Sequence, residues 1–127
     1  MTERGRVLLI EDDKFLRRAC EASLRQRGFE VTSAVDGEEG LHLALTPPFA
    51  QVVLLDLLMP KLTGIEVLRA LKSDAMTATI PVLILSNSSR EEDQRVALEL
   101  GAAGYYVKSN LSLKDLAAHV VRLVAHA

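Results

Sequence analysis

Five short runs of aliphatic and β-branched residues alternate along the chain with longer segments in which apolar residues recur every three or four positions. Runs that are apolar at nearly every position are typical of strands buried on both faces of a parallel sheet. The longer segments have the periodicity of the amphipathic helices that cover such a sheet. The alternation predicts an α/β domain of five βα units, with helices on both faces of one parallel sheet.

The expected strands are short, and the run at 52–55 is the most uniformly apolar, so we expect it at the sheet centre. The five runs are 7–10, 30–34, 52–55, 80–85 and 105–107. Two capping boxes mark the starts of helices, Thr63 with Glu66 and Ser89 with Glu92. The other expected helix caps are Asp13, Asp36 and Ser112. The expected helix ends are at Gly28, Pro47, Pro48 and Gly101.

The length of 127 residues, with 49% hydrophobic and 25% charged residues, fits one compact domain with a single core. We therefore expect one domain over residues 1–127, with its core at about 6–124. No charged start followed by a long apolar stretch predicts a signal peptide or membrane span, so the cytoplasm is the expected location.

The formal net charge of -2 gives the chain no general attraction for nucleic acid or anionic lipid. Its basic cluster alternates with apolar residues and is expected to be a solvated helix face. The cluster consists of Arg17, Arg18, Arg25 and Arg27. The single cysteine, Cys20, falls on the apolar stripe of the first helix, so we expect it to pack in the core.

Polar side chains follow four of the five expected strands at the point where each strand ends. In a parallel sheet with right-handed crossovers these ends share one edge, which is where ligands bind in open α/β sheets. The residues are Glu11, Asp12, Asp13, Asp56, Ser86 and Lys108. The sequence therefore predicts a site that combines carboxylates, a hydroxyl and an ammonium group at this edge.

Each of these residues also has a purely structural interpretation. Asp13 is best explained as a helix cap, and Ser86 would serve equally well as a loop hydroxyl. A lysine such as Lys108 is more often solvated than part of a site. Asp56 is harder to explain in this way because it ends a fully apolar strand, where a buried carboxylate is costly unless something compensates its charge.

A magnesium ion would relieve the repulsion among Glu11, Asp12 and Asp56, because Mg²⁺ prefers oxygen ligands. It binds only one or two carboxylates directly and leaves positions for a phosphoryl oxygen. The Lys108 ammonium and the Ser86 hydroxyl would neutralise charge on the other side of a phosphoryl group. The residues thus predict Asp56 as a carboxylate that accepts a phosphoryl group, with Mg²⁺ beside it.

Four motifs together resemble the receiver domain of two-component response regulators, over nearly the whole chain. They are VLLIEDD (7–13), VVLLDLLMPKLTG (52–64), PVLILS (81–86) and GYYVK (104–108). The resemblance implies a doubly wound, flavodoxin-like (βα)5 fold with strand order 2-1-3-4-5 and helices on both faces.

The resemblance also implies a role for each site residue. Asp56 would be the phosphoacceptor, and Ser86 and Lys108 would bind the phosphoryl oxygens. The implied metal ligands are the carboxylates of Glu11, Asp12 and Asp56 and the backbone carbonyl of Leu58. The domain would assist its own phosphorylation and dephosphorylation, rather than act as an enzyme on a separate substrate.

Signalling in the family implies a switch in which the Ser86 hydroxyl shifts toward the phosphoryl group and Tyr105 turns inward. A half-buried strand tyrosine explains Tyr105 nearly as well. The implied phosphodonor is a phosphohistidine on a sensor histidine kinase or phosphotransfer protein. The implied output is an altered surface of the fourth helix, fifth strand and fifth helix, which binds an unidentified downstream protein.

Three departures from the usual family pattern surround the site. Ser109 replaces a proline, and because a cis peptide without proline costs about 3 kcal/mol, we expect the Lys108 loop to follow a different path or to be more mobile. Asn87 replaces a small residue, so its bulk would hinder the switch or its amide would bond the phosphoryl group. Leu57 and Leu58 make the region after Asp56 unusually apolar and are expected to change the access of hydrolytic water.

Two alternatives stay open at the level of sequence. Ser109 and Asn87 motivate a receiver fold used for constitutive docking, with an impaired switch. A magnesium-dependent phosphatase with an aspartyl nucleophile is disfavoured, because its second acid would stand at the position of Leu58. The three histidines have no paired spacing for a metal and are interpreted as surface residues. They are His42, His119 and His126.

Overall fold

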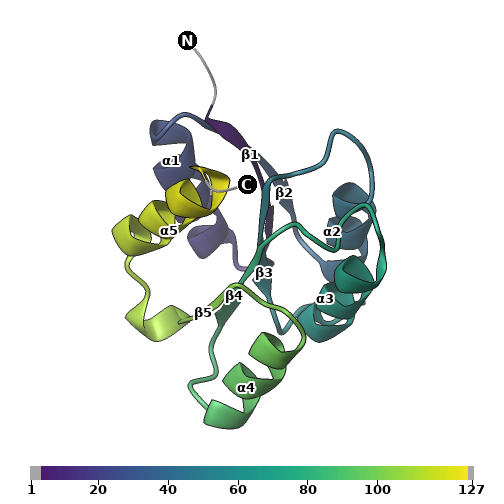
Figure 1. Ribbon diagram of the computed structural model, residues 1–127. Helices are drawn as coiled ribbons and strands as arrows, with labels where there is room; N and C mark the ends of the chain where they lie inside the picture. The colour runs from purple at the N-terminus through teal and green to yellow at the C-terminus, as the bar shows by residue number, and fades with distance from the viewer. Residues whose placement is uncertain (1–3, 126–127) are drawn as a thin grey trace.

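The structure, a computed structural model, describes residues 4–125 and contains one five-stranded parallel sheet covered by helices (Figure 1). The strands are β1 (Gly5–Ile10), β2 (Phe29–Ala34), β3 (Val52–Asp56), β4 (Val82–Ser86) and β5 (Gly104–Val107). The helices are α1 (Lys14–Gln26), α2 (Gly37–Ala44), α3 (Gly64–Ser73), α4 (Glu91–Glu99) and α5 (Leu113–Ala125), with a 3-10 turn η1 at Lys108–Asn110. The strand order β2-β1-β3-β4-β5 confirms the doubly wound fold, with β3 at the centre.

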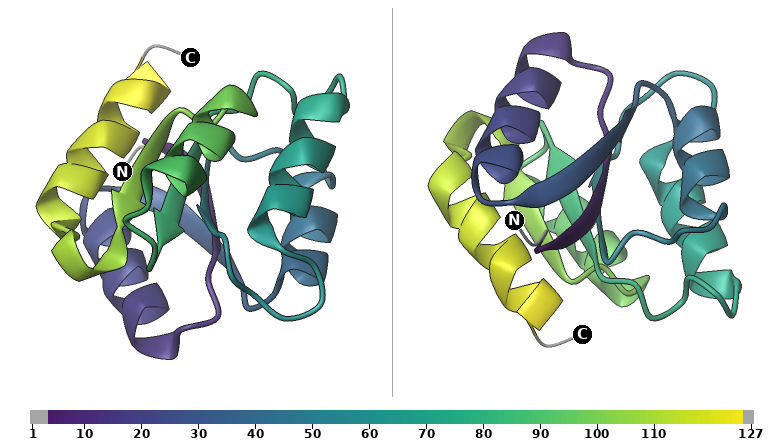
Figure 2. Two further views of the ribbon diagram at one scale, coloured as in Figure 1. Left: turned by 90° about the horizontal axis from the view of Figure 1, so that it is seen from below. Right: turned by 90° about the horizontal axis from the view of Figure 1, so that it is seen from above.

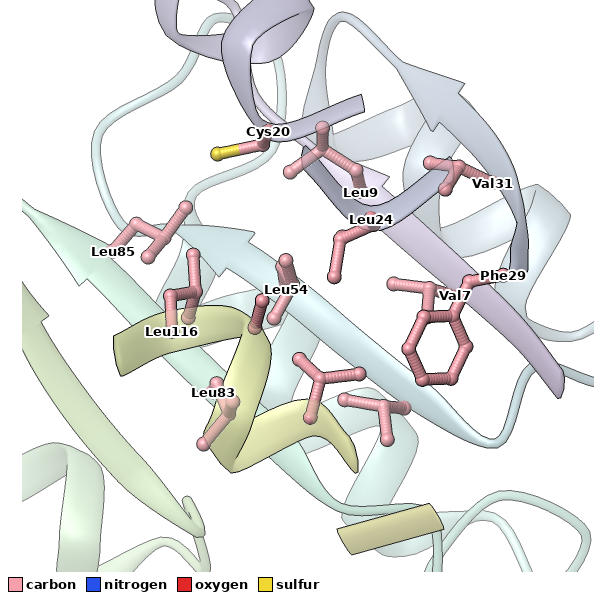
Figure 3. Packing of buried hydrophobic residues seen from close by; sticks show 13 residues of the cluster. Val7, Leu9, Cys20, Leu24, Phe29, Val31, Leu54, Leu83, Leu85 and Leu116 are labelled. Atoms are coloured by element: carbon pink, nitrogen blue, oxygen red, sulfur yellow. The ribbon is translucent and has the colours of Figure 1, made fainter. Parts of the chain in front are cut away.

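The helices form two layers on opposite faces of the sheet, α1 and α5 on one face and α2, α3 and α4 on the other (Figure 2). Successive strand side chains point to opposite faces, so each central strand supplies both cores. Leu9 and Leu54 pack toward α1 and α5, where Cys20 is also buried as expected (Figure 3). Ile10 and Leu55 pack in the second core.

Most of the expected helix caps are confirmed. Asp13 Oδ1 accepts hydrogen bonds from the first-turn amides of α1, and Asp36 caps α2 in the same way. The expected Thr63–Glu66 pair caps α3, since Thr63 Oγ1 accepts from the Glu66 amide and donates to the Glu66 carboxylate. Gly28 and Gly101 follow the ends of α1 and α4 with positive φ angles of 92° and 102°, a conformation that favours glycine.

The expected capping box of Ser89 with Glu92 is wrong. Helix α4 begins one residue later than that box requires, with Arg90 at the N-cap and no side-chain cap bond. Ser88 does the equivalent work, since its hydroxyl accepts from the Arg90 amide and bonds the carboxylate of Asp93. Glu92 instead turns outward and pairs with Arg95, 2.7 Å away.

The basic cluster of α1 is also not simply a solvated face. Arg17 donates to the carbonyls of the β1–α1 connection, and Arg25 donates to the Val31 carbonyl of β2. Arg27 binds the carbonyl of Ser23, one turn back along the helix. Of the four arginines in this cluster, Arg18 alone has a guanidinium without a hydrogen bond or ion pair to residues 4–125.

Gly64, the first residue of α3, lies directly against the end of β3. A Cβ atom there would be 2.3 Å from the Asp56 carbonyl oxygen and 2.6 Å from Leu57 Cα. The Gly64 amide also donates to the Leu57 carbonyl at 2.9 Å. These contacts hold the connection between β3 and α3 close to the carboxyl end of β3.

We expect Gly64→Ala to destabilise the domain by about 2 kcal/mol or more, because the backbone cannot yield to the new methyl group. Helix propensity alone predicts the opposite sign, since alanine is about 1 kcal/mol more favourable than glycine in a helix. Urea unfolding measures the difference. Ala22→Gly, at an exposed position of α1, is the control for propensity, and a Gly64→Ala variant as stable as the wild type would contradict the expectation.

Candidate functional site

Strand register brings the predicted site residues to one edge of the sheet. Ile10 pairs with Leu55, so Glu11 and Asp56 leave adjacent strands side by side. Ser86 ends β4 and pairs with Val107, so Lys108 leaves the sheet next to it. The structure thus places all of the predicted side chains at the carboxyl edge, while their functional roles stay predictions.

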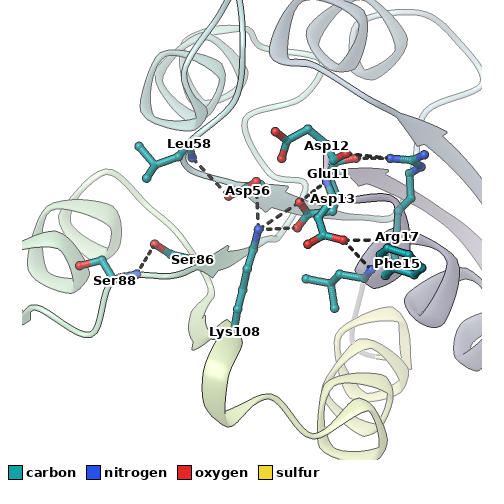
Figure 4. Close-up of polar contacts among 11 residues, drawn as sticks. Glu11, Asp12, Asp13, Phe15, Arg17, Asp56, Leu58, Ser86, Ser88 and Lys108 are labelled. Carbon is teal, nitrogen blue, oxygen red and sulfur yellow. Dashed lines mark hydrogen bonds and ion pairs between the residues drawn. The ribbon is translucent and has the colours of Figure 1, made fainter.

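Lys108 is the cation at the centre of this edge (Figure 4). Its Nζ atom lies 3.0 Å from Asp56 Oδ2 and 2.9 Å and 3.0 Å from the two oxygens of Glu11. Glu11 is 0% exposed and Asp56 3% exposed. The ammonium group compensates two carboxylates that could not otherwise be buried together.

The acidic residues also fit a divalent cation. Glu11, Asp12 and Asp56 each offer a carboxylate oxygen, and these atoms lie within 4.8 Å of one another. Glu11 Oε1 is buried, and its one close polar contact within residues 4–125 is the ion pair with Lys108, whereas Oε2 also accepts from the Asp13 amide at 3.0 Å. A cluster that has one ammonium group for three carboxylates suits a hard cation such as Mg²⁺.

Electrostatics at the site are unbalanced toward negative charge. Burial, together with the neighbouring charge of Glu11, raises the pKa of Asp56 from 3.8 to about 7, although Lys108 opposes this shift. Burial works to lower the pKa of Lys108, but its hydrogen bonds and charge interactions with Glu11 and Asp56 outweigh burial and raise that pKa. The ammonium group of Lys108 therefore stays charged, whereas Asp56 ionises less readily than an ordinary aspartate unless a further cation is bound.

The residues around the predicted switch are joined by hydrogen bonds. Ser86 is buried, and its Oγ accepts from the Ser88 amide at 3.1 Å. Tyr105 is half-buried, and its hydroxyl donates to the Ser88 carbonyl at 2.9 Å. Asn87, which lies between Ser86 and Ser88 in the sequence, is exposed and has no hydrogen bond to residues 4–125. One loop therefore contacts both predicted switch residues.

The chain after Lys108 takes a short 3-10 turn, which starts at Lys108 itself. Within residues 4–125 the cis peptide bond is Pro47–Pro48, so the peptide between Lys108 and Ser109 is trans. The lysine nevertheless reaches both carboxylates. After Asp56, Leu57 is buried, whereas Leu58 is 69% exposed and its amide donates to Asp56 Oδ1 at 3.2 Å.

Sequence reasoning missed the contacts of two side chains, one at the functional edge and one on α5. Arg17 donates to the backbone of the acidic pair, and the available signal was its position in the first turn of α1, because helical side chains lean toward the N-terminus. His119 is a half-buried residue rather than a surface one, and its Nδ1 is 2.6 Å from the Tyr106 hydroxyl. His42 is exposed as expected, and His126 lies outside the described residues.

Comparison with known proteins identifies the class. The model of the response regulator receiver domain matches residues 7–121. The chain therefore belongs to the receiver domains of two-component response regulators, whose members interact with histidine kinases.

Two curated relatives illustrate the match. The chain is 41% identical to the transcriptional regulatory protein PrrA of Mycobacterium tuberculosis, over 94% of the chain and 49% of the relative. It is 39% identical to the gliding motility regulatory protein of Myxococcus xanthus, over 95% of the chain and 15% of the relative. The chain thus spans about half, or less, of these relatives, and those longer proteins include transcriptional regulators.

Solved structures agree with this class. The Francisella response regulator 1452 receiver domain has a TM-score of 0.88 and 30% identity, with 96% of this chain and 98% of that chain covered. The Mn²⁺-bound response regulator Rcp1 has a TM-score of 0.80 and 31% identity, covering 94% and 91%. The phosphorylated cyanobacterial phytochrome response regulator RcpA has a TM-score of 0.79 and 31% identity, covering 94% and 90%.

None of the helices in residues 4–125 is long and apolar enough to span a membrane.

Asp56 should make the stability of the metal-free protein depend on pH. Its pKa is raised from 3.8 to about 7 by folding, so the folded state binds the proton more tightly and stability falls as the pH rises through this interval. In EDTA, Asp56→Asn should raise the melting temperature by about 5 °C at pH 8 and have little effect at pH 4.

Thermal unfolding followed by circular dichroism across this pH range measures the effect. Asp115→Asn, which removes an exposed carboxylate on α5, is the matched control and should shift the melting temperature little at any pH. If Asp56→Asn changed the melting temperature equally at pH 4 and pH 8, the raised pKa of Asp56 would be contradicted.

Proposed function

We propose that this receiver domain accepts a phosphoryl group on Asp56, with Mg²⁺ as its cofactor, and signals by changing its α4–β5–α5 surface. The observation that carries the proposal is the buried carboxylate at the end of β3, 3.0 Å from the Lys108 ammonium and within 4.8 Å of the acids Glu11 and Asp12. The proposed phosphodonor is a phosphohistidine on a sensor histidine kinase or a phosphotransfer protein.

In the transfer, an Asp56 carboxylate oxygen bonds to phosphorus while the phosphorus–nitrogen bond to the donor imidazole breaks, and the imidazole leaves with the bonding electrons and takes up a proton. Lys108 would exchange one contact with Asp56 for a contact with a phosphoryl oxygen. The Ser86 hydroxyl already accepts a bond from the Ser88 amide, so its own hydrogen is free to donate to the phosphoryl group.

The residues that would hold Mg²⁺ are Glu11, Asp12, Asp56 and the backbone carbonyl of Leu58. When bound, Mg²⁺ supplies positive charge that offsets the charge on the phosphoryl oxygens and keeps Asp56 ionised beside Glu11. Two solved relatives support this part of the proposal, since Rcp1 was solved with Mn²⁺ bound and RcpA was solved phosphorylated. The domain acts here as a phosphoacceptor that assists its own phosphorylation and dephosphorylation.

The route to the output surface would run through the β4–α4 loop. The Tyr105 hydroxyl donates to the Ser88 carbonyl, and the Ser88 amide donates to Ser86 Oγ, so a shift of Ser86 toward a phosphoryl group would disturb both contacts of Ser88. Helix α4 begins three residues after Ser88 and would move with it. The reader of the altered surface would be a protein partner, and contact with nucleic acid or a membrane is not part of the proposal.

Intact mass after incubation with Mg²⁺ and a small phosphodonor tests the function. The wild type should gain the mass of one phosphoryl group, and Asp56→Asn should gain none. EDTA should abolish the gain, while Asp115→Asn, the exposed control, should behave like the wild type.

No gain in the wild type would favour constitutive docking over phosphorylation. A gain in Asp56→Asn would mean that the acceptor lies elsewhere. Turnover of free phosphate monoesters by the wild type would favour the phosphatase alternative.

A further inference from the structure

We propose that Arg17 is a positioning residue for the metal site, because its guanidinium holds the peptide backbone that joins Glu11 to Asp12. The inference rests on the proposed function, since it concerns the same divalent cation. Arg17 Nη1 donates to the Glu11 carbonyl at 3.0 Å and to the Asp12 carbonyl at 3.3 Å (Figure 4). The side chain is half-buried and runs back from the first turn of α1 toward the end of β1.

Other contacts fix both ends of the β1–α1 connection but not its middle. The Glu11 amide donates to the Ala34 carbonyl at 3.0 Å, which extends the pairing with β2. Asp13 is tied to α1 because its carboxylate caps the first turn. Asp12, between them, has no hydrogen bond to residues 4–125 other than the one from Arg17. Arg17 is therefore the contact that fixes the Asp12 peptide and the point from which its exposed carboxylate extends.

The guanidinium binds carbonyl oxygens and forms no ion pair with a carboxylate of residues 4–125. Neutralisation of the acids is left to Lys108, so Arg17 orders the acidic pair without competing with a cation for carboxylate oxygens. Arg17 uses one nitrogen for both carbonyls. An ammonium group can do the same, as Lys72 Nζ does with the carbonyls of Ala78 and Ile80, so lysine at position 17 should keep part of the contact.

Charge and positioning predict opposite effects on metal affinity. If the positive charge of Arg17 acted mainly on the cation, its removal would relieve repulsion and tighten Mg²⁺ binding. If Arg17 orients ligands, its removal would weaken binding, because the loss of groups that orient metal ligands typically costs about 10- to 100-fold in affinity. The sign of the change therefore distinguishes the two roles.

The experiment compares Arg17→Gln and Arg17→Lys with Arg18→Gln, a matched control that removes one exposed positive charge next door in sequence. The Mg²⁺ dissociation constant is obtained from the Mg²⁺-dependent rise in melting temperature at physiological salt. We expect binding about tenfold weaker in Arg17→Gln, a smaller loss in Arg17→Lys, and no weakening in Arg18→Gln.

Amide hydrogen exchange in EDTA gives a second readout that needs no metal. Exchange at the hydrogen-bonded amides of Glu11 and Asp13 should speed up in Arg17→Gln while amides of β3 and α3 keep their protection. A purely structural role would instead accelerate exchange throughout the domain.

The outcomes separate this inference from the function on which it rests. A wild type that binds no Mg²⁺ would overturn both. A wild type that binds Mg²⁺ and an Arg17→Gln variant that binds it equally well or more tightly would overturn the role of Arg17 alone. Uniform loss of exchange protection in Arg17→Gln, with unchanged Mg²⁺ affinity per folded molecule, would also overturn it.

Discussion

The contact of the Lys108 ammonium with Glu11 and Asp56 is the interaction on which the functional edge depends. Both carboxylates are shielded from water, and two ionised acids at the ends of adjacent strands are tolerated only if a cation compensates them. The lysine directly follows the edge strand β5, so this contact ties the outer part of the sheet to its centre. The strand order thus brings the compensating ammonium group to the two buried carboxylates.

The charge of one ammonium group does not neutralise the three carboxylates of the site, and this imbalance determines what the site can bind. Three carboxylates converge there, one ammonium group contacts two of them, and the pKa of Asp56 is raised to about 7. Such a cluster is stabilised by a divalent cation and is suited to a group that brings further negative charge only when that cation is present. Membership of the receiver family agrees with this electrostatic description.

Local signals in the sequence were reliable where a short segment decides the outcome. The Thr63–Glu66 cap formed because both partners lie within one helical turn. The Ser89–Glu92 box failed although its spacing was correct, because Ser88 captured Asp93 and the helix began later. Arg17 and His119 were missed because their partners, backbone carbonyls and a tyrosine of β5, are defined only when α1 and α5 pack on the sheet.

By itself the sequence determined the α/β class, the central position of β3 and the set of polar residues at the carboxyl edge, because apolar periodicity and strand ends are local properties. The tertiary structure decided which of those residues touch. Packing brought Lys108 into contact with both Glu11 and Asp56, although Ser109 stands where the family usually has a proline. It also directed the Arg17 side chain toward the backbone of the acidic pair instead of toward solvent. Distances between side chains on separate elements depend on strand register and helix packing, which no single segment encodes.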